Sequence, residues 1–271
     1  MRSRRGTLAI AFGGGALLLI ALLAIVAPLV APADPTMPAL RARLRPPSAA
    51  HVLGQDALGR DVAARLVHGA RVSLGVGLAS VAVSLAIGIA LGALGGWAGG
   101  WVDEAIARVI DVFLAFPGLL LAIALAGVLG PSVGNVVLAL GLLGWTGYAR
   151  LVRTQVASLS HREFAEAARA LGAGPVHILA LHVLPLAAPA VLVQATFGLS
   201  GAILAEAGLS FLGLGTPPPT PSWGGMLGEG RTFLLVAPYL TLAPGAALTL
   251  TVLALQVLGD GLRDRLDVRE D

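Results

Sequence analysis

The stretch VSLGVGLASVAVSLAIGIALGAL, residues 72–94, decides the fold. It carries no charged residue and exceeds the roughly 20 apolar residues that a helix needs to cross the hydrocarbon core of a bilayer. The whole chain of 271 residues is 56% hydrophobic and only 12% charged, and its mean hydropathy is +0.86. A soluble protein needs more charge than this to cover its surface. The sequence therefore predicts an all-α membrane protein.

Other apolar segments of similar length lie on both sides of this stretch. They are residues 7–30, 109–129, a segment that ends near Tyr148, 186–209 and 236–258. Pro117 lies inside the third span. Arginines before the first span also fit a signal peptide, but its apolar run is longer than such a peptide needs, so we expect a retained helix. Six transmembrane helices are predicted.

The segments between the spans give the domain organisation. Residues 1–30 form an N-terminal tail with the first span, residues 31–71 a polar connection, residues 72–258 a five-helix core, and residues 259–271 a tail. Residues 60–71 place Asp61 and Arg65 opposite Val62 and Leu66 at helical spacing. This pattern is typical of a helix that lies at the membrane surface before the second span.

Composition excludes several kinds of chemistry. There is no cysteine, hence no disulfide, and no lysine, hence no P-loop of the Gly-x-x-x-x-Gly-Lys-[Ser/Thr] type. The 18 basic residues, all arginine, are spread over short segments, which does not indicate nucleic-acid binding. His51, Asp56 and Asp61 do not follow a metal-ligand spacing, so we expect solvated side chains and no metal site. We expect no catalytic residue.

The most charged segment, residues 150–185, contains a helical hairpin. Residues 163–171 are rich in helix formers, and Gly172 can adopt the backbone angles that end a helix. Pro175 suits the first position of a second helix, and Pro185 is expected to end it. The hairpin is long enough to dock into another protein, although spacing alone equally fits a solvated loop.

Several motifs in this chain occur together in one family. They are Glu166-Ala167-Ala168 with Gly172 and Leu184-Pro185, residues 51–61, Asp111 with Ala115-Phe116-Pro117, residues 147–150, 209–215, 221–224 and 258–264. In this order they resemble permeases of bacterial ABC importers for dipeptides, oligopeptides or nickel, of the second-permease type. Val52 and Gln55 depart from the family pattern, where Pro and Thr are usual. The resemblance covers nearly the whole chain.

The resemblance implies a type I ABC importer permease fold and a set of partners. A homologous second permease, two ATP-binding subunits that hold ATP and magnesium, and an extracytoplasmic solute-binding protein are expected. The 150–185 loop would dock on the ATP-binding subunits, through Glu166 as a charged contact, Ala167 and Ala168 as close-packing positions and Gly172 as the bend. The loop and both termini would face the bacterial cytoplasm. Eleven arginines would then lie inside and seven outside, so the positive-inside rule gives this orientation modest support.

Two carboxylates are candidates for the pathway itself, because charge within a membrane is costly. Asp111 lies near the predicted cytoplasmic end of the third span, where a solvated side chain or a pair with Arg108 is favoured over contact with the cargo. Glu206 lies near the external end of the fifth span and lines the pathway or pairs between helices. The loop at residues 210–235, with Trp223, is either a surface for the binding protein or a stiff connector.

Two other classes compete with the importer. A channel or ion-coupled carrier is disfavoured by the few intramembrane charges and the lack of detectable inverted repeats. A membrane enzyme needs convergent polar groups inside the spans, whereas all five histidines lie outside the predicted spans. Within the importer class, peptide and nickel or another small solute stay open as cargo.

Overall fold

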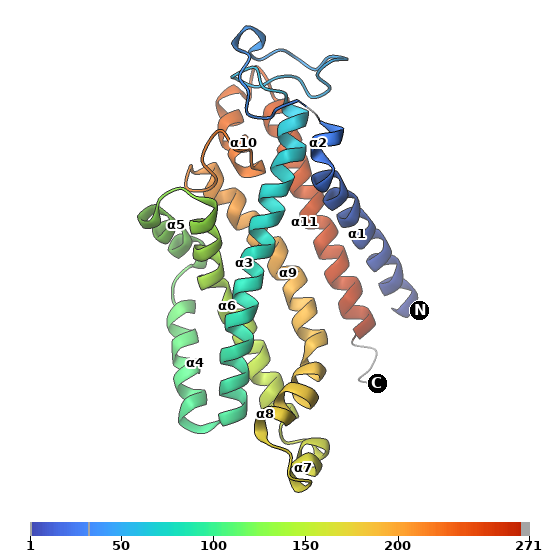
Figure 1. Ribbon diagram of the computed structural model, residues 1–271, viewed down its shortest axis with the longest axis vertical. Coiled ribbons are helices and arrows are strands. Elements are labelled where there is room, and N and C mark those ends of the chain that lie inside the picture. Colours follow the sequence, from blue (N-terminus) through green and yellow to red (C-terminus); the bar gives the residue numbers. More distant parts are fainter. Residues whose placement is uncertain (1, 32, 267–271) are drawn as a thin grey trace.

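The computed structural model describes residues 2–31 and 33–266, and this part of the chain forms a bundle of long helices (Figure 1). Five of its helices are long and apolar enough to cross a membrane. They are α1 (Arg2–Ile25), α3 (Val62–Ala98), α6 (Val133–Leu159), α9 (Leu184–Phe211) and α11 (Tyr239–Leu266). The bent pair α4 (Gly100–Leu114) and α5 (Gly118–Leu129) provides the sixth span if it is counted as one. The prediction of an all-α protein with several spans is confirmed.

Short elements connect the spans. They are α2 (Ala27–Val30), η1 (Leu40–Ala42), α7 (Glu163–Ala170), α8 (Pro175–Ile178), the π-helical turn η2 (Leu179–Val183), α10 (Trp223–Gly230) and η3 (Arg231–Phe233). In Figure 1, α7 and α8 lie at one end of the bundle, and α10 lies at the other with residues 33–61. Helix α1 begins and α11 ends on the side of the bundle where α7 lies.

The third span is not one straight helix, contrary to the sequence prediction. Helices α4 and α5 meet at an angle of 81°. Pro117 caps the start of α5 with an extended backbone, φ −60° and ψ 114°. Proline has no N–H for the helix ladder, and its ring disfavours helical angles in the residue before it. Pro117 therefore divides the span.

The second span is longer than predicted, and the separate surface helix does not exist. Helix α3 runs without a break from Val62, with the Asp61 carboxylate accepting a hydrogen bond from the Ala64 N–H at 2.7 Å. It packs closely on α6 along Gly88, Gly92 and Gly96. A Cβ at Gly92 would lie 2.6 Å from the Ala149 carbonyl oxygen. Small residues four apart let two membrane helices approach this closely.

The sequence predicted that Pro185 ends the second helix of the hairpin, and this prediction is wrong. Helix α8 continues through the π-helical turn into α9, and Pro185 lies in the first turn of α9. Proline has no N–H to donate to the preceding turn, and its ring would clash with a carbonyl there; a wider π-helical turn accommodates both. Two other helices run past the predicted ends of their spans: α6 continues to Leu159 and α11 continues to Leu266. The predicted loop and C-terminal tail are therefore partly helical, and residues 267–271 lie outside the described residues.

Candidate functional site

The α7–α8 hairpin is closed by backbone hydrogen bonds around Gly172. The Gly172 N–H donates to the Arg169 carbonyl at 2.9 Å, and the Ala173 N–H donates to the Ala168 carbonyl at 3.0 Å. Gly172 has a φ of +84°, the left-handed conformation that this closure requires. The sequence prediction of a helix end at Gly172 is confirmed.

The inner face of the hairpin is anchored to the bundle. Ala165, Ile178 and Val183 are completely buried. They form one apolar cluster with Ala93 of α3 and with Val152, Val156 and Leu159 of α6. Arg169 adds a polar anchor, because it donates to the Ser160 carbonyl at 2.9 Å and its guanidinium lies 5.2 Å from the centre of the Trp97 ring. The hairpin is thus held rigidly against the ends of α3 and α6.

The outer face of the hairpin is open. Glu163, Glu166, Ala167 and Ala170 are exposed at the i, i+3, i+4 and i+7 positions of α7. Leu171 is 88% exposed and Val176 is 77% exposed. A rigid surface that combines carboxylates with exposed apolar side chains is suited to docking on another protein. We call Glu163, Glu166, Ala167, Leu171 and Val176 the hairpin surface.

The structure brings most of the predicted coupling residues together. Glu166 and Ala167 lie on the exposed face, Gly172 forms the bend, and Ala168 is half-buried against the anchoring cluster. Pro185 lies apart, beyond the π-helical turn. Ala165 is an anchoring residue outside the predicted set, although the spacing of Phe164, Ala165 and Ala168 marks an inner face. The docking roles of these residues stay predictions.

An ion-pair network that is buried except at Glu229 lies at the opposite end of the bundle. Arg65 Nη1 contacts both Asp56 and Glu229, and Arg60 lies 2.7 Å from Asp56 and 2.8 Å from Glu229. Asp56, Arg60 and Arg65 are at most 5% exposed. Burial opposes ionisation of Asp56, but the Arg60 backbone N–H and the two guanidinium groups outweigh it and lower the pKa of this carboxyl. The network ties residues 56–60 to α3 and α10.

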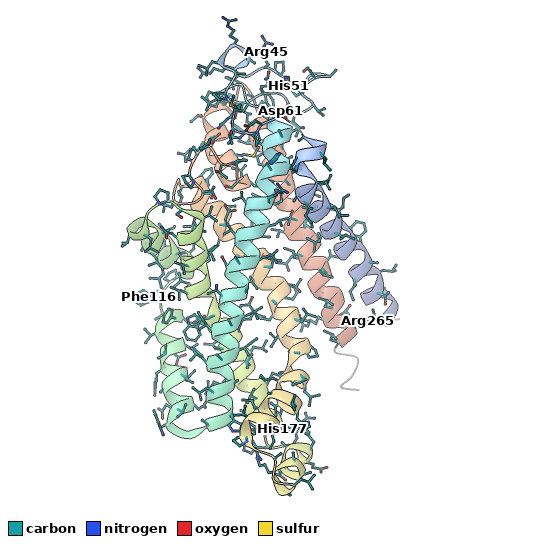
Figure 2. All side chains as sticks on the ribbon, in the orientation of Figure 1. Arg45, His51, Asp61, Phe116, His177 and Arg265 are labelled. Atoms are coloured by element: carbon teal, nitrogen blue, oxygen red, sulfur yellow. The ribbon has the colours of Figure 1, made fainter. Side chains whose placement is uncertain are left out.

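This network corrects two sequence predictions. Asp56 is buried and not solvated, and Arg65 lies in the protein interior and not on a helix at the membrane surface. His51 and Asp61 do lie together, with His51 Nδ1 2.7 Å from the Asp61 carboxylate, close to Arg45 at the tip of the molecule (Figure 2). Among the described residues, no cluster of three or more His, Cys, Asp or Glu side chains is placed to hold a metal.

Trp223 is not a surface residue, so its side chain does not form part of a surface for the binding protein, one of the two roles predicted for the 210–235 segment. It is 2% exposed, and its indole N–H donates to the Leu66 carbonyl at 3.0 Å. The stretch around it is not a plain loop either, because it forms α10. Ser222 caps this helix by accepting a hydrogen bond from the Gly225 N–H.

The two pathway candidates occupy different environments. Asp111 is exposed and lies 3.8 Å from Arg150, whereas Arg108, the partner expected from the sequence, pairs with Glu104 at 3.3 Å. Glu206 is completely buried and accepts a hydrogen bond from Ser210 at 2.7 Å. Ser210 lies one turn further along the same helix, α9, so this bond does not join Glu206 to another helix. Neither assignment to the pathway is tested by these contacts.

Known proteins match this arrangement in sequence and in fold. Residues 87–270, about two thirds of the chain, match the family described as "Binding-protein-dependent transport system inner membrane component". The di/tripeptide transport system permease protein DppC of Pseudomonas aeruginosa (strain UCBPP-PA14) is 44% identical over 257 residues, which is 93% of this chain and 85% of that protein. The glutathione transport system permease protein GsiD of Shigella flexneri serotype 5b (strain 8401) is 48% identical over 221 residues, or 82% and 73% of the two chains.

The fold has a counterpart among solved structures. A chain of the MetNI methionine ABC transporter, solved in inward facing conformations, superposes with a TM-score of 0.58. The match covers 72% of this chain and 93% of the other, at 20% sequence identity. It confirms the expected type I ABC importer permease fold, and at this identity it bears on the fold alone.

Proposed function

The chain belongs to the family of binding-protein-dependent transport system inner membrane components, and on this premise we propose that it imports peptides. It is the permease subunit of an ATP-driven importer and forms one half of the translocation pathway. Di- or oligopeptides are the cargo, because relatives that match 93% and 91% of the chain are named as di/tripeptide and dipeptide permeases. A solute-binding protein delivers the cargo, and a homologous permease supplies the other half.

The observation that carries the coupling role is the hairpin surface. The sequence has no P-loop, so ATP chemistry has to be supplied by separate subunits that bind ATP and magnesium. A closed hairpin whose inner face is buried and whose outer face exposes Glu166, Leu171 and Val176 can transmit a movement without deforming. We assign the hairpin surface to docking on the ATP-binding subunits.

The orientation follows from this assignment. With the hairpin in the cytoplasm of a bacterial inner membrane, the starting end of α1 and the final end of α11 also lie on the cytoplasmic side (Figure 1). Residues 33–61 and α10 then face the binding protein. The ion pairs of the buried Asp56 and Arg65, which extend to the more exposed Glu229, give that surface a fixed shape.

A cross-linking experiment on the assembled importer tests the docking role. The chain has no cysteine, so Ala167→Cys on the exposed face of α7 introduces a single reactive thiol. A short thiol-to-amine cross-linker should join it to an ATP-binding subunit. Ser48→Cys, exposed at the opposite end, is the matched control and should give no such product. The assignment is wrong if Ser48→Cys gives the product and Ala167→Cys does not.

A further inference from the structure

A cavity of about 280 Å³ lies among α3, α5, α6 and α9, away from the hairpin. Four polar side chains line it: Ser80 and Ser84 of α3, Tyr148 of α6 and Gln194 of α9. The rest of the lining is glycine and aliphatic side chains, and the described lining residues include no charged group. Asp111 and Glu206, the carboxylates singled out from the sequence, are not among them. The polar character of this cavity is therefore entirely neutral.

Two of these side chains are buried but unpaired. Ser80 is 1% exposed and Tyr148 is 4% exposed. Within the described part of the chain, neither the Ser80 Oγ nor the Tyr148 Oη has a hydrogen-bond partner. Buried hydroxyls are nearly always paired, because an unpaired one loses its interaction with water without compensation. Ser84 differs, since its Oγ donates to the Gly141 carbonyl at 3.0 Å.

The surrounding helices make room for the Tyr148 hydroxyl without pairing it. It lies against Gly198 of α9, where a Cβ would collide with the hydroxyl oxygen. On the other side, Gly88 of α3 admits the Tyr148 side chain so closely that its own Cβ would lie 2.5 Å from the Tyr148 Cβ. Tyr148 thus lines the cavity while its hydroxyl has no hydrogen-bond partner among the described residues.

We propose that Ser80 and Tyr148, with Ser84 and Gln194, form a hydrogen-bonding subsite for the backbone amide groups of a peptide in transit. A hydroxyl oxygen accepts hydrogen bonds, so it can pair with the N–H of a peptide amide. Amide groups are common to all peptides, whereas side-chain charge varies, and an uncharged lining favours no particular side chain. The volume is slightly below the roughly 300 Å³ at which small-molecule sites begin, as expected of one half of a site shared with a second permease.

The inference rests on the proposed peptide import, and conservative variants in the complete importer test it. Tyr148→Phe and Ser80→Ala each remove a hydroxyl that has no partner within the described residues, so abundance and thermal stability should not fall. Uptake at saturating loaded binding protein should fall about 2- to 13-fold per hydroxyl, the range for one neutral hydrogen bond. The chain's other tyrosine gives a matched control, because its hydroxyl donates to the Arg45 and Gln55 carbonyls at 3.0 and 3.1 Å. Tyr239→Phe should therefore lower thermal stability.

A second substrate separates cargo contact from a structural role. The dipeptide Gly-Gly is compared with glycyl-sarcosine, which lacks the amide N–H, each at binding-protein saturation. The loss caused by the two variants should be smaller for the N-methylated peptide, because one of the interactions is already missing. Equal losses for both peptides, or a loss that only follows abundance, would overturn the subsite. Failure of the wild-type importer to take up any peptide would overturn the proposed function, whereas normal wild-type uptake with unaffected variants would overturn the subsite alone.

Discussion

Replacement of Gly172 tests whether the shape of the hairpin matters for transport. Gly172 has a φ of +84°, and a Cβ built there meets nothing within 4 Å. The cost of a side chain is therefore backbone strain and not a collision. For a residue with a Cβ the left-handed conformation costs about 1–2 kcal/mol, and a β-branched residue is at the upper end. Gly172→Val should thus lower the ratio of closed to opened hairpin by about 5- to 30-fold.

The neighbouring Gly174 provides the matched control. It caps α8 with an ordinary φ of −69°, and a Cβ there also meets nothing within 4 Å. Gly174→Ala should therefore leave the hairpin unchanged. Gly172→Asn should be milder than Gly172→Val, because asparagine tolerates the left-handed conformation. The order of defects should follow backbone strain and not side-chain volume.

The assay is peptide uptake by the assembled importer, measured at matched protein abundance with ATP hydrolysis in parallel. The strain is small beside the packing of the spans, so Gly172→Val should still insert normally. Its uptake should fall, and hydrolysis should respond less to loaded binding protein. Uptake by Gly172→Val equal to that of the wild type would refute the reasoning, and so would an equal defect in Gly174→Ala.

Three further predictions concern other residues. Glu166→Ala, which removes an exposed carboxylate without straining α7, should weaken the response of ATP hydrolysis to loaded binding protein at normal abundance; an unchanged response argues against a charged contact. Ser48→Cys should react with an impermeant maleimide in intact cells and the exposed Ser158→Cys should not; the reverse pattern would invert the orientation. Asp56→Asn should lower the free energy of unfolding by about 3 kcal/mol, the low end for breaking a buried pair, because Glu229 still pairs with Arg65. Because the pKa of Asp56 is lowered from 3.8, its contribution is present above that pH and is lost as the pH falls below it. The difference in thermal midpoint between the wild type and Asp56→Asn should therefore stay constant between pH 7 and pH 5, and a difference that shrank over this range would contradict the assignment.

The sequence predicted the spans because apolar length is a local property. It also predicted the bend at Gly172, because only glycine adopts a φ of +84° without strain. The division of the third span at Pro117 was within reach, since Pro117 was noticed, but the 81° angle depends on how α5 packs against α6. The continuity of α3 was obscured because polar residues at its start resembled a surface helix.

What the sequence could not give are pairings between distant segments. Asp56 and Arg65 look solvated in a linear reading, but both are buried, and Arg65 pairs with Glu229 far along the chain. Tyr148 was noted as part of a family motif without a role, and its unpaired hydroxyl becomes visible only when α3 and α9 close around it. The carboxylates Asp111 and Glu206 stand out in the sequence because charge in a membrane is costly, whereas neutral hydroxyls carry no such signal.

The most direct test of the importer assignment is uptake of a labelled dipeptide into proteoliposomes. The chain is reconstituted alone, and then with its homologous permease, the ATP-binding subunits and the binding protein. Uptake should require every component and ATP, and nickel in place of the dipeptide should not be carried. Peptide flux through the chain by itself, or ATP-driven uptake of nickel without peptide, would contradict the account.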